Sequence, residues 1–175
     1  MLRPLKARVN TAVHFVKAAL SGQSRKNVLQ EQWSIGIYRL TYDNGRYTLA
    51  EDEQASNPVL TSKSIGDRRT GFAADPFLIR ENGMHYMFFE VFKKDRGSIG
   101  FAVSKNGRKW KFKQLVLEEP FHLSYPFVFK WNGKWFMLPE AFETKSIRVY
   151  EAVRFPDTWA FVKTISTGRE YVDPT

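Results

Sequence analysis

Acidic residues recur at matching places in this chain, in a pattern that could assemble a carboxylate site. Asp75 and Asp173 each stand immediately before a proline, and Tyr125 holds the equivalent place in a second copy. Glu90 and Glu140 each follow the proline of their own copy by fourteen positions. Converging carboxylates suit glycoside chemistry, in which one acid protonates the leaving oxygen while another carboxylate activates water or attacks the sugar.

Asp75 and Glu140 are therefore the predicted catalytic carboxyls. The predicted substrate-binding residues are His122, Tyr125, Glu90, Asp173 and Arg69. Structural alternatives stay open, because an Asp before Pro commonly forms a turn and a recurring Glu favours a hydrogen bond repeated in each unit. No His spacing typical of metal ligands occurs and Cys is absent, so neither a metal nor another cofactor is predicted.

The carboxyls belong to a repeat with a period near fifty residues. Residues 72–90 and 124–140 share one order: a proline, an apolar strand, an Asn-Gly turn, an aromatic strand and a Glu. The proline precedes the Asn by six residues in both copies, and a third copy opens at 172–174. Such a period, built from short strands, predicts a repeat architecture whose units stack face to face.

Each repeat reads as four antiparallel strands, the pattern of one β-propeller blade. The predicted strands are 76–81, 84–92, 97–103 and 109–117, then 127–131, 134–142, 146–153 and 159–165. An eight-stranded sandwich would not require the same order and turns in both copies. Because the first strand of each blade lines the central channel, residues at its start should converge on one funnel.

The N-terminal part differs in pattern. Apolar residues at three- and four-residue steps predict a helix over 5–20, followed by a polar linker. Residues 32–49 read as a hairpin, and 51–71 as a loop. We therefore divide the chain into a basic amphipathic helix with linker (1–30) and an incomplete propeller (31–175). The propeller is expected to be truncated at the start of its third blade, because two blades cannot close a ring.

The net charge of +9 is concentrated at the N-terminus, where residues 1–30 contribute six basic and no acidic side chains before Glu31. The remainder is nearly balanced, which argues against a nucleic-acid partner. Docking of the helix on protein is favoured over contact with a membrane surface, because its apolar stripe is mainly Val and Ala. Without Cys or a run of transmembrane length, a cytoplasmic location is expected.

Residues 74–77, 122–126, 138–140 and 171–175 carry a family resemblance. The sequence resembles the N-terminal domain of plant glucosamine inositolphosphorylceramide transferases, also found beside bacterial formyltransferase-like domains. That domain is similar to the five-bladed propellers of glycoside hydrolase families 43 and 32. The resemblance implies a five-bladed fold and matches Asp75 to the hydrolase base or nucleophile. The second-blade Asp is replaced by Tyr125, and the third-blade acid Glu would lie beyond Thr175.

These observations predict an all-β propeller fragment that binds a carbohydrate or glycoconjugate. We expect it to be an accessory or substrate-binding part of a glycan- or sugar-nucleotide-modifying transferase, beside a downstream transferase domain. One alternative is a family 43/32-like glycoside hydrolase that uses Asp75 as base or nucleophile, and another is a protein-interaction propeller. The sequence leaves open whether the chain is itself an enzyme.

Overall fold

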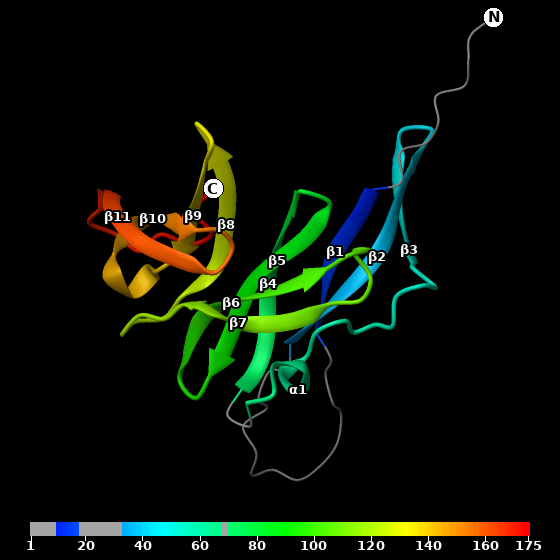
Figure 1. Cartoon of the computed structure of the whole chain (residues 1–175), viewed down its shortest axis with the longest axis horizontal. Helices are drawn as coiled ribbons and strands as arrows, with labels where there is room; N and C mark the ends of the chain where they lie inside the picture. The colour runs from blue at the N-terminus through cyan, green and yellow to red at the C-terminus, as the bar shows by residue number, and fades with distance from the viewer. Residues whose placement is uncertain (1–9, 18–32, 68–69) are drawn as a thin grey trace, which may run out of the picture.

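The computed structural model describes residues 10–17, 33–67 and 70–175, and these residues are mostly β-strand. Within them, the strands form one three-stranded sheet and two four-stranded sheets, each built from antiparallel pairs. The three sheets lie side by side, with the middle sheet in green between the other two (Figure 1). The all-β class predicted from the sequence is thereby confirmed.

The first sheet has the order β1–β2–β3. Its strands are β1 (Asn10–Lys17), β2 (Trp33–Asp43) and β3 (Arg46–Glu51). The helix predicted over residues 5–20 is not confirmed, because residues 10–17 instead pair with β2 along their whole length. Thr11, Val13 and Val16 are β-branched and fit an extended backbone, and β2 offers this segment a ladder of hydrogen bonds. The rest of 5–20 lies outside the described residues.

The two repeats form the four-stranded sheets. The first blade comprises β4 (Thr70–Glu81), β5 (Met84–Lys93), β6 (Arg96–Ser104) and β7 (Lys111–Leu117). The second blade comprises β8 (Ser124–Trp131), β9 (Lys134–Glu140), β10 (Ser146–Arg154) and β11 (Thr158–Thr167). A short helix, α1 (Ser62–Ile65), lies within the predicted loop 51–71, and a 3-10 turn, η1 (Phe142–Thr144), follows β9. Both blades are meanders in chain order.

Residues at equivalent positions adopt the same conformations and make the same hydrogen bonds in the two blades. Asn82 and Asn132 adopt left-handed φ values of 49° and 47°, each followed by a glycine with positive φ. Two consecutive left-handed residues form the hairpin turn that matches the twist of the flanking strands. Trp110 Nε1 donates to the carbonyl three residues earlier at 3.0 Å, and Trp159 Nε1 does the same at 2.8 Å. The repeat inferred from spacing is therefore a structural repeat.

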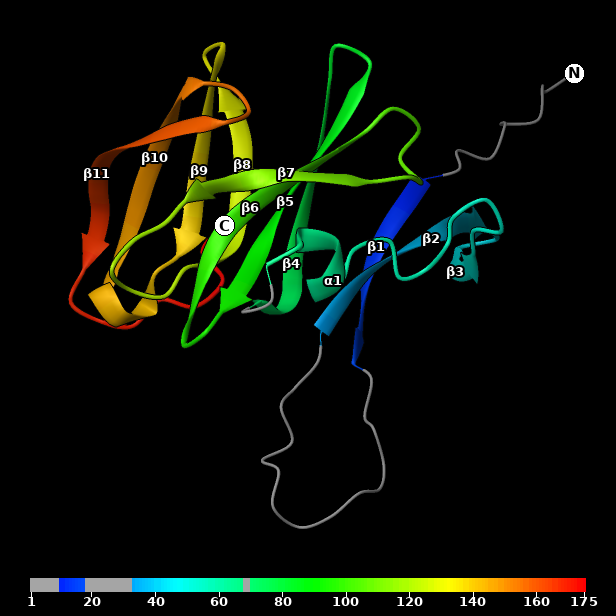
Figure 2. The same cartoon turned by 60° about the horizontal axis from the view of Figure 1, so that its bottom comes forward.

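The first blade is buried on both faces, as a blade between two neighbours must be. Phe88 on β5 packs into a core shared with the second blade, whereas Met87 and Phe89 pack against Ile35 and Ile37 of the three-stranded sheet. Phe88 and Phe89 are both 0% exposed. Inner strand β4 lies beside β8 on one side and β2 on the other (Figure 2). This arrangement brings the starts of β4 and β8 together.

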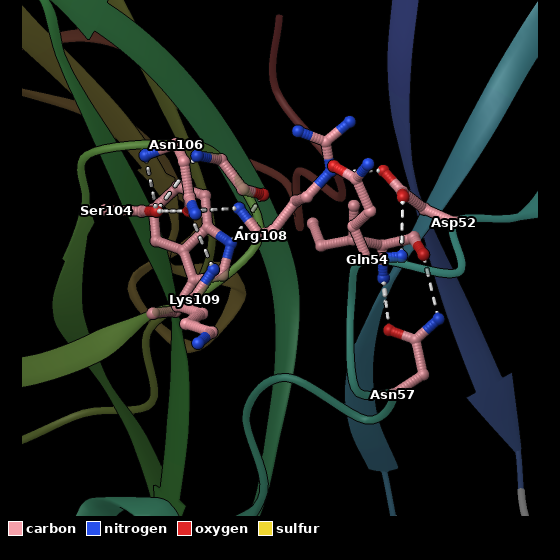
Figure 3. Close-up of polar contacts among 10 residues, drawn as sticks. Asp52, Gln54, Asn57, Ser104, Asn106, Arg108 and Lys109 are labelled. Atoms are coloured by element: carbon pink, nitrogen blue, oxygen red, sulfur yellow. Dashed lines mark hydrogen bonds and ion pairs between the residues drawn. The ribbon is translucent and has the colours of Figure 1, made fainter.

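Polar contacts fasten the three-stranded sheet to the first blade. Arg108 Nε donates to Asp52 Oδ2 at 2.8 Å, joining the β6–β7 turn to the segment after β3 (Figure 3). Asn57 pairs with the backbone of Ile37 as a strand would, accepting from its N–H and donating to its carbonyl, both at 2.8 Å. The Arg108–Asp52 bond thus ties the first blade to the three-stranded sheet, and the Asn57 pair holds the segment after β3 against β2.

The second blade exposes an apolar groove of about 490 Å³ on its far face. Phe129, Phe136 and Val162 line it beside Trp131, which is 63% exposed. Fifty residues earlier, the equivalents of Phe129 and Phe136 are Ile79 and Tyr86 of the first blade, which pack against the second blade. The repeat thus exposes on one blade the positions that it covers on the other. That the propeller is incomplete stays a prediction.

We expect this groove to make the 175-residue chain self-associate at high concentration, because an apolar patch of this kind favours contact between molecules. Changing Trp131→Ser together with Val162→Lys should shift light-scattering mass in size-exclusion chromatography toward the monomer. Val153→Lys is the matched control, since Val153 is 71% exposed but lies outside the groove. A wild-type chain that stays monomeric at every concentration would contradict this expectation.

Candidate functional site

The residue before each repeated proline adopts an unusual backbone conformation. Asp75, Tyr125 and Asp173 have φ values of 50°, 43° and 48°, in the left-handed region that non-glycine residues seldom occupy. The strand register shifts at the first two of these residues, as at a β-bulge. Such residues cost on the order of 1–3 kcal/mol each and cluster at functional sites, where a bulge re-aims a side chain. All three copies retain the conformation.

Carboxyl groups of one unit hold the turn of the next. Asp75 Oδ2 accepts a hydrogen bond from the backbone N–H of Tyr125 at 3.2 Å. Glu140 Oε2 accepts one from the backbone N–H of Asp173 at 2.8 Å. The acceptors come from different places in the repeat, since Asp75 opens an inner strand and Glu140 ends the second strand of its blade. The turn-forming alternative therefore applies to both predicted catalytic carboxyls.

Glu90 makes no such bond. It is 5% exposed, and its Oε1 has no hydrogen-bond partner among the described residues. His122 Nε2 lies 3.5 Å from Oε1 without forming a hydrogen bond. His122 Nδ1 accepts the backbone N–H of Gly97 at 3.0 Å, so the neutral imidazole carries its proton on Nε2, facing Glu90. A carboxyl group and an imidazole N–H thus face each other.

The carboxyls perturb one another electrostatically. Burial, reinforced by the charges of Asp75 and Glu140, raises the pKa of Glu90 to about 8. Burial raises the pKa of Asp75, opposed by the Tyr125 N–H and reinforced by Asp173. The pKa of Glu140 is also raised, by burial first. At neutral pH Glu90 therefore holds a proton, and the arrangement can present one carboxylic acid beside carboxylates.

Burial lowers the pKa of His122, with Glu143 opposing the shift. The His122 ring also lies beside Phe92 and Phe142, with ring centroids 6.2 Å and 5.7 Å away. The imidazole is therefore neutral near pH 7, and its Nε2–H is a donor rather than a cation.

The structure brings most of the predicted site residues together. The gathered residues are Asp75, Glu90, His122, Tyr125, Glu140 and Asp173. Arg69 lies outside the described residues. In residues 10–17, 33–67 and 70–175, no group of three or more His, Asp or Glu residues could hold a metal ion. Whether these side chains contact a ligand stays a prediction.

Sequence reasoning missed the role of Gly97, which it placed where a turn meets the predicted strand 97–103. A Cβ there would lie 2.3 Å from the backbone oxygen of Leu123 and 2.6 Å from Glu90 Oε1. Only glycine fits between the segment after β7 and the Glu90 carboxyl. A glycine opening a strand was the available signal, because such a residue often marks a close backbone approach.

The packed blades, with inner strands β4 and β8 side by side, define a β-propeller-like domain with the fold of certain glycoside hydrolases. The family 32 β-fructofuranosidase of Bombyx mori superposes with a TM-score of 0.58 at 19% identity, covering 94% of this chain and 36% of that chain. An α-L-arabinanase of Cellvibrio cellulosa, solved with arabinohexaose, gives 0.51 at 13% identity, covering 85% and 51%. At such identities these likenesses establish the fold alone.

The chain belongs to the family described as "Glucosamine inositolphosphorylceramide transferase 1, N-terminal", whose model matches residues 30–175. The transferase of that name from Arabidopsis thaliana is 35% identical over 150 residues, covering 76% of this chain and 19% of the relative. The one from Oryza sativa subsp. japonica is 39% identical over 115 residues, covering 63% and 16%. The chain thus spans less than a fifth of these relatives.

A 1,2-beta-oligomannan phosphorylase of Thermoanaerobacter sp. is 30% identical over 105 residues, covering 58% of this chain and 30% of that protein.

In the described part of the chain, no helix is long and apolar enough to cross a membrane.

Proposed function

We propose that this chain is a carbohydrate-binding propeller domain of a glycan- or glycoconjugate-modifying transferase. The saccharide would sit at the mouth where β4 and β8 begin. The observation that carries the proposal is the convergence of Asp75, Glu90, Glu140 and Asp173 from two blades and the segment after β11. Carboxyl groups that converge in this way provide polar contacts that can orient sugar hydroxyls.

The relatives support the carbohydrate assignment. The family name is that of a glucosamine inositolphosphorylceramide transferase, and the proteins of similar fold carry the names of a fructofuranosidase and an arabinanase. Because the chain corresponds to less than a fifth of the transferases, we assign transfer itself to a separate domain of the whole protein. We further propose that the whole propeller has five blades, of which this chain supplies two.

Asp75→Asn tests the site. The amide still accepts the Tyr125 N–H, so the free energy of unfolding should change by only about 1 kcal/mol. Loss of the charge at the mouth should weaken saccharide binding by roughly 10-fold or more. Isothermal titration with methyl glycosides measures the affinity, and urea unfolding measures the stability.

Glu81→Gln is the control, because Glu81 ends the same strand, β4, and pairs with Lys130 at the surface. It should leave the affinity unchanged. Equal affinities of the wild type and Asp75→Asn would leave Asp75 as a turn residue and remove it from the site.

A hydrolase is the second candidate, favoured by one observation: a protonated Glu90 lies near the Asp75 carboxyl, the combination of acid and base that glycoside cleavage needs. Nitrophenyl glycosides of several sugars distinguish it from the binding domain. Turnover that is lost in both Asp75→Asn and Glu90→Gln would establish the hydrolase, whereas binding without turnover supports the accessory domain.

A further inference from the structure

The two glutamates that recur in the blades, Glu90 and Glu140, differ in their hydrogen bonding. In the second blade Glu140 bonds the N–H of the next left-handed residue, Asp173. In the first blade the equivalent N–H is that of Tyr125, and Asp75 has taken it instead of Glu90. A purely structural role would give Glu90 the bond that Glu140 has. The turn at Tyr125 is therefore held without a hydrogen bond from Glu90.

The chain nevertheless holds Glu90 in a buried environment that neighbouring residues are placed to form. Its Oε1 is buried without a hydrogen bond, and a buried polar atom without a partner costs on the order of 1–3 kcal/mol. Gly97 leaves room for the carboxyl by lacking a Cβ, and its N–H fixes the His122 ring so that Nε2–H faces Glu90. These three residues come from β5, β6 and the segment after β7. An unsatisfied buried carboxyl calls for an explanation, and a ligand that completes its hydrogen bonding supplies one.

We propose that Glu90 is the ligand-contacting carboxyl of the first blade, and that in its neutral acid form it donates a hydrogen bond to an uncharged oxygen of the bound saccharide. This inference rests on the proposed function and deepens it. The ligand class is a neutral sugar that presents a hydroxyl, ether or carbonyl oxygen. Glu90 makes this donor contact, while Asp75 and Glu140 hold the turns and the charge of Asp75 contributes to the site as proposed above.

The surroundings of Glu90 favour the acid form. Asp75 faces it from β4 and Glu140 from β9, both carboxyls, with Asp173 beside those two. His122 is neutral, so no cation among the described residues faces Glu90 to stabilise its anion. Burial and these charges together raise its pKa to about 8. A protonated carboxyl donates through its O–H, and the described chain offers that proton no acceptor at Oε1.

Two substitutions at Glu90 test the inference in the 175-residue chain. Glu90→Gln keeps an uncharged donor, whereas Glu90→Leu removes all polarity at similar size. The probes are the methyl glycosides of glucose, mannose and N-acetylglucosamine, with methyl glucosaminide as the cationic comparison. Affinities are measured by isothermal titration from pH 6.5 to 9.5, and circular dichroism confirms the fold of each variant.

The wild type should bind a neutral glycoside and lose roughly 10-fold in affinity for each pH unit above the pKa of Glu90. Glu90→Gln should bind within about 3-fold of the wild type at pH 7 and show no alkaline loss. Glu90→Leu should bind at least about 10-fold more weakly at pH 7. Because the glutamine amide can also accept, the separation of Gln from Leu identifies a donor only together with the alkaline loss in the wild type.

Two results overturn the inference alone: wild-type affinity in Glu90→Leu, or a loss in Glu90→Gln as large as in Glu90→Leu, which would mean that the anion is needed. Preference for methyl glucosaminide with loss in Glu90→Gln would also overturn it, in favour of an ammonium ligand. If the wild type binds none of the four probes at any pH, the proposed function fails and this inference with it.

Discussion

Replacing Gly97 by alanine is expected to destabilise the chain by about 3 kcal/mol, a large effect for one methyl group. The new Cβ would lie 2.3 Å from the backbone oxygen of Leu123, and backbone cannot rotate away as a side chain can. Moving Gly97 would strain two hydrogen bonds, because its N–H donates to His122 Nδ1 and its carbonyl accepts from the Leu123 N–H. Both the fold and the Glu90 environment should suffer.

Gly100→Ala on the same strand is the matched control. Its Cβ would meet Val91 Cγ2 at 2.9 Å and Phe112 Cε2 at 3.0 Å, which are ends of side chains that can shift. We expect this variant to lose only about 1 kcal/mol. Urea unfolding of both variants measures the difference, and equal losses would show that the backbone contact at Gly97 does not control stability.

The strand pattern could be predicted closely because its signals are local. The predicted strand 84–92 appears as β5, Met84–Lys93, and 97–103 appears as β6, Arg96–Ser104. The Asn-Gly pairs at 82–83 and 132–133 form tight hairpins, so the ends of the paired strands follow from two residues, whereas Asn106-Gly107 lies in the longer connection between β6 and β7. Alternation in β5, with Phe88 on one face and Phe89 on the other, follows from the two-residue period of a strand.

The N-terminal segment shows where local signals fail. Val13 and Val16 fit a helical stripe, but valine is also a strong strand former. Whether such a segment becomes helix or strand depends on the partner it finds, here β2, which lies beyond a polar linker. Pairing at that separation is a tertiary effect that a window of residues cannot contain.

The gathering of the carboxyls in the site could be predicted from the sequence, but their hydrogen-bond partners could not, because those partners also depend on tertiary structure. Recurrence placed Asp75 and Asp173 before the prolines of their copies and Glu90 and Glu140 fourteen residues after theirs, and stacked blades would then gather these carboxyls. It could not say which carboxyl bonds which N–H, because that depends on distances of a few tenths of an ångström at Tyr125 and Asp173. The structural alternative of one hydrogen bond repeated in each blade therefore holds for only one of the two glutamates: Glu140 makes the bond to the next turn, and Glu90 does not.

Glu90→Gln is expected to stabilise the chain increasingly as the pH rises from 5 to 8. The pKa of Glu90 is about 8 in the folded protein, against an ordinary value of 4.5. The folded state therefore retains a proton that the unfolded state has released, and wild-type stability falls with rising pH across this window. Glutamine does not titrate, so the variant avoids this loss. Its advantage over the wild type should grow by roughly 3 kcal/mol between pH 5 and pH 8.

Other titrating groups do not produce this pH-dependent difference in stability between the variant and the wild type. The raised pKa values of Asp75 and Glu140 also reduce stability as the pH rises, and the lowered pKa of His122 reduces it as the pH falls through about 6.5. All three remain in the variant, so the difference between variant and wild type isolates Glu90, apart from its coupling to them. Urea midpoints measured at half-unit steps of pH give that difference. A constant difference from pH 5 to 8 would mean that Glu90 ionises normally. Its surroundings would then have to stabilise the carboxylate anion, although Oε1 is buried without a hydrogen-bond partner among the described residues.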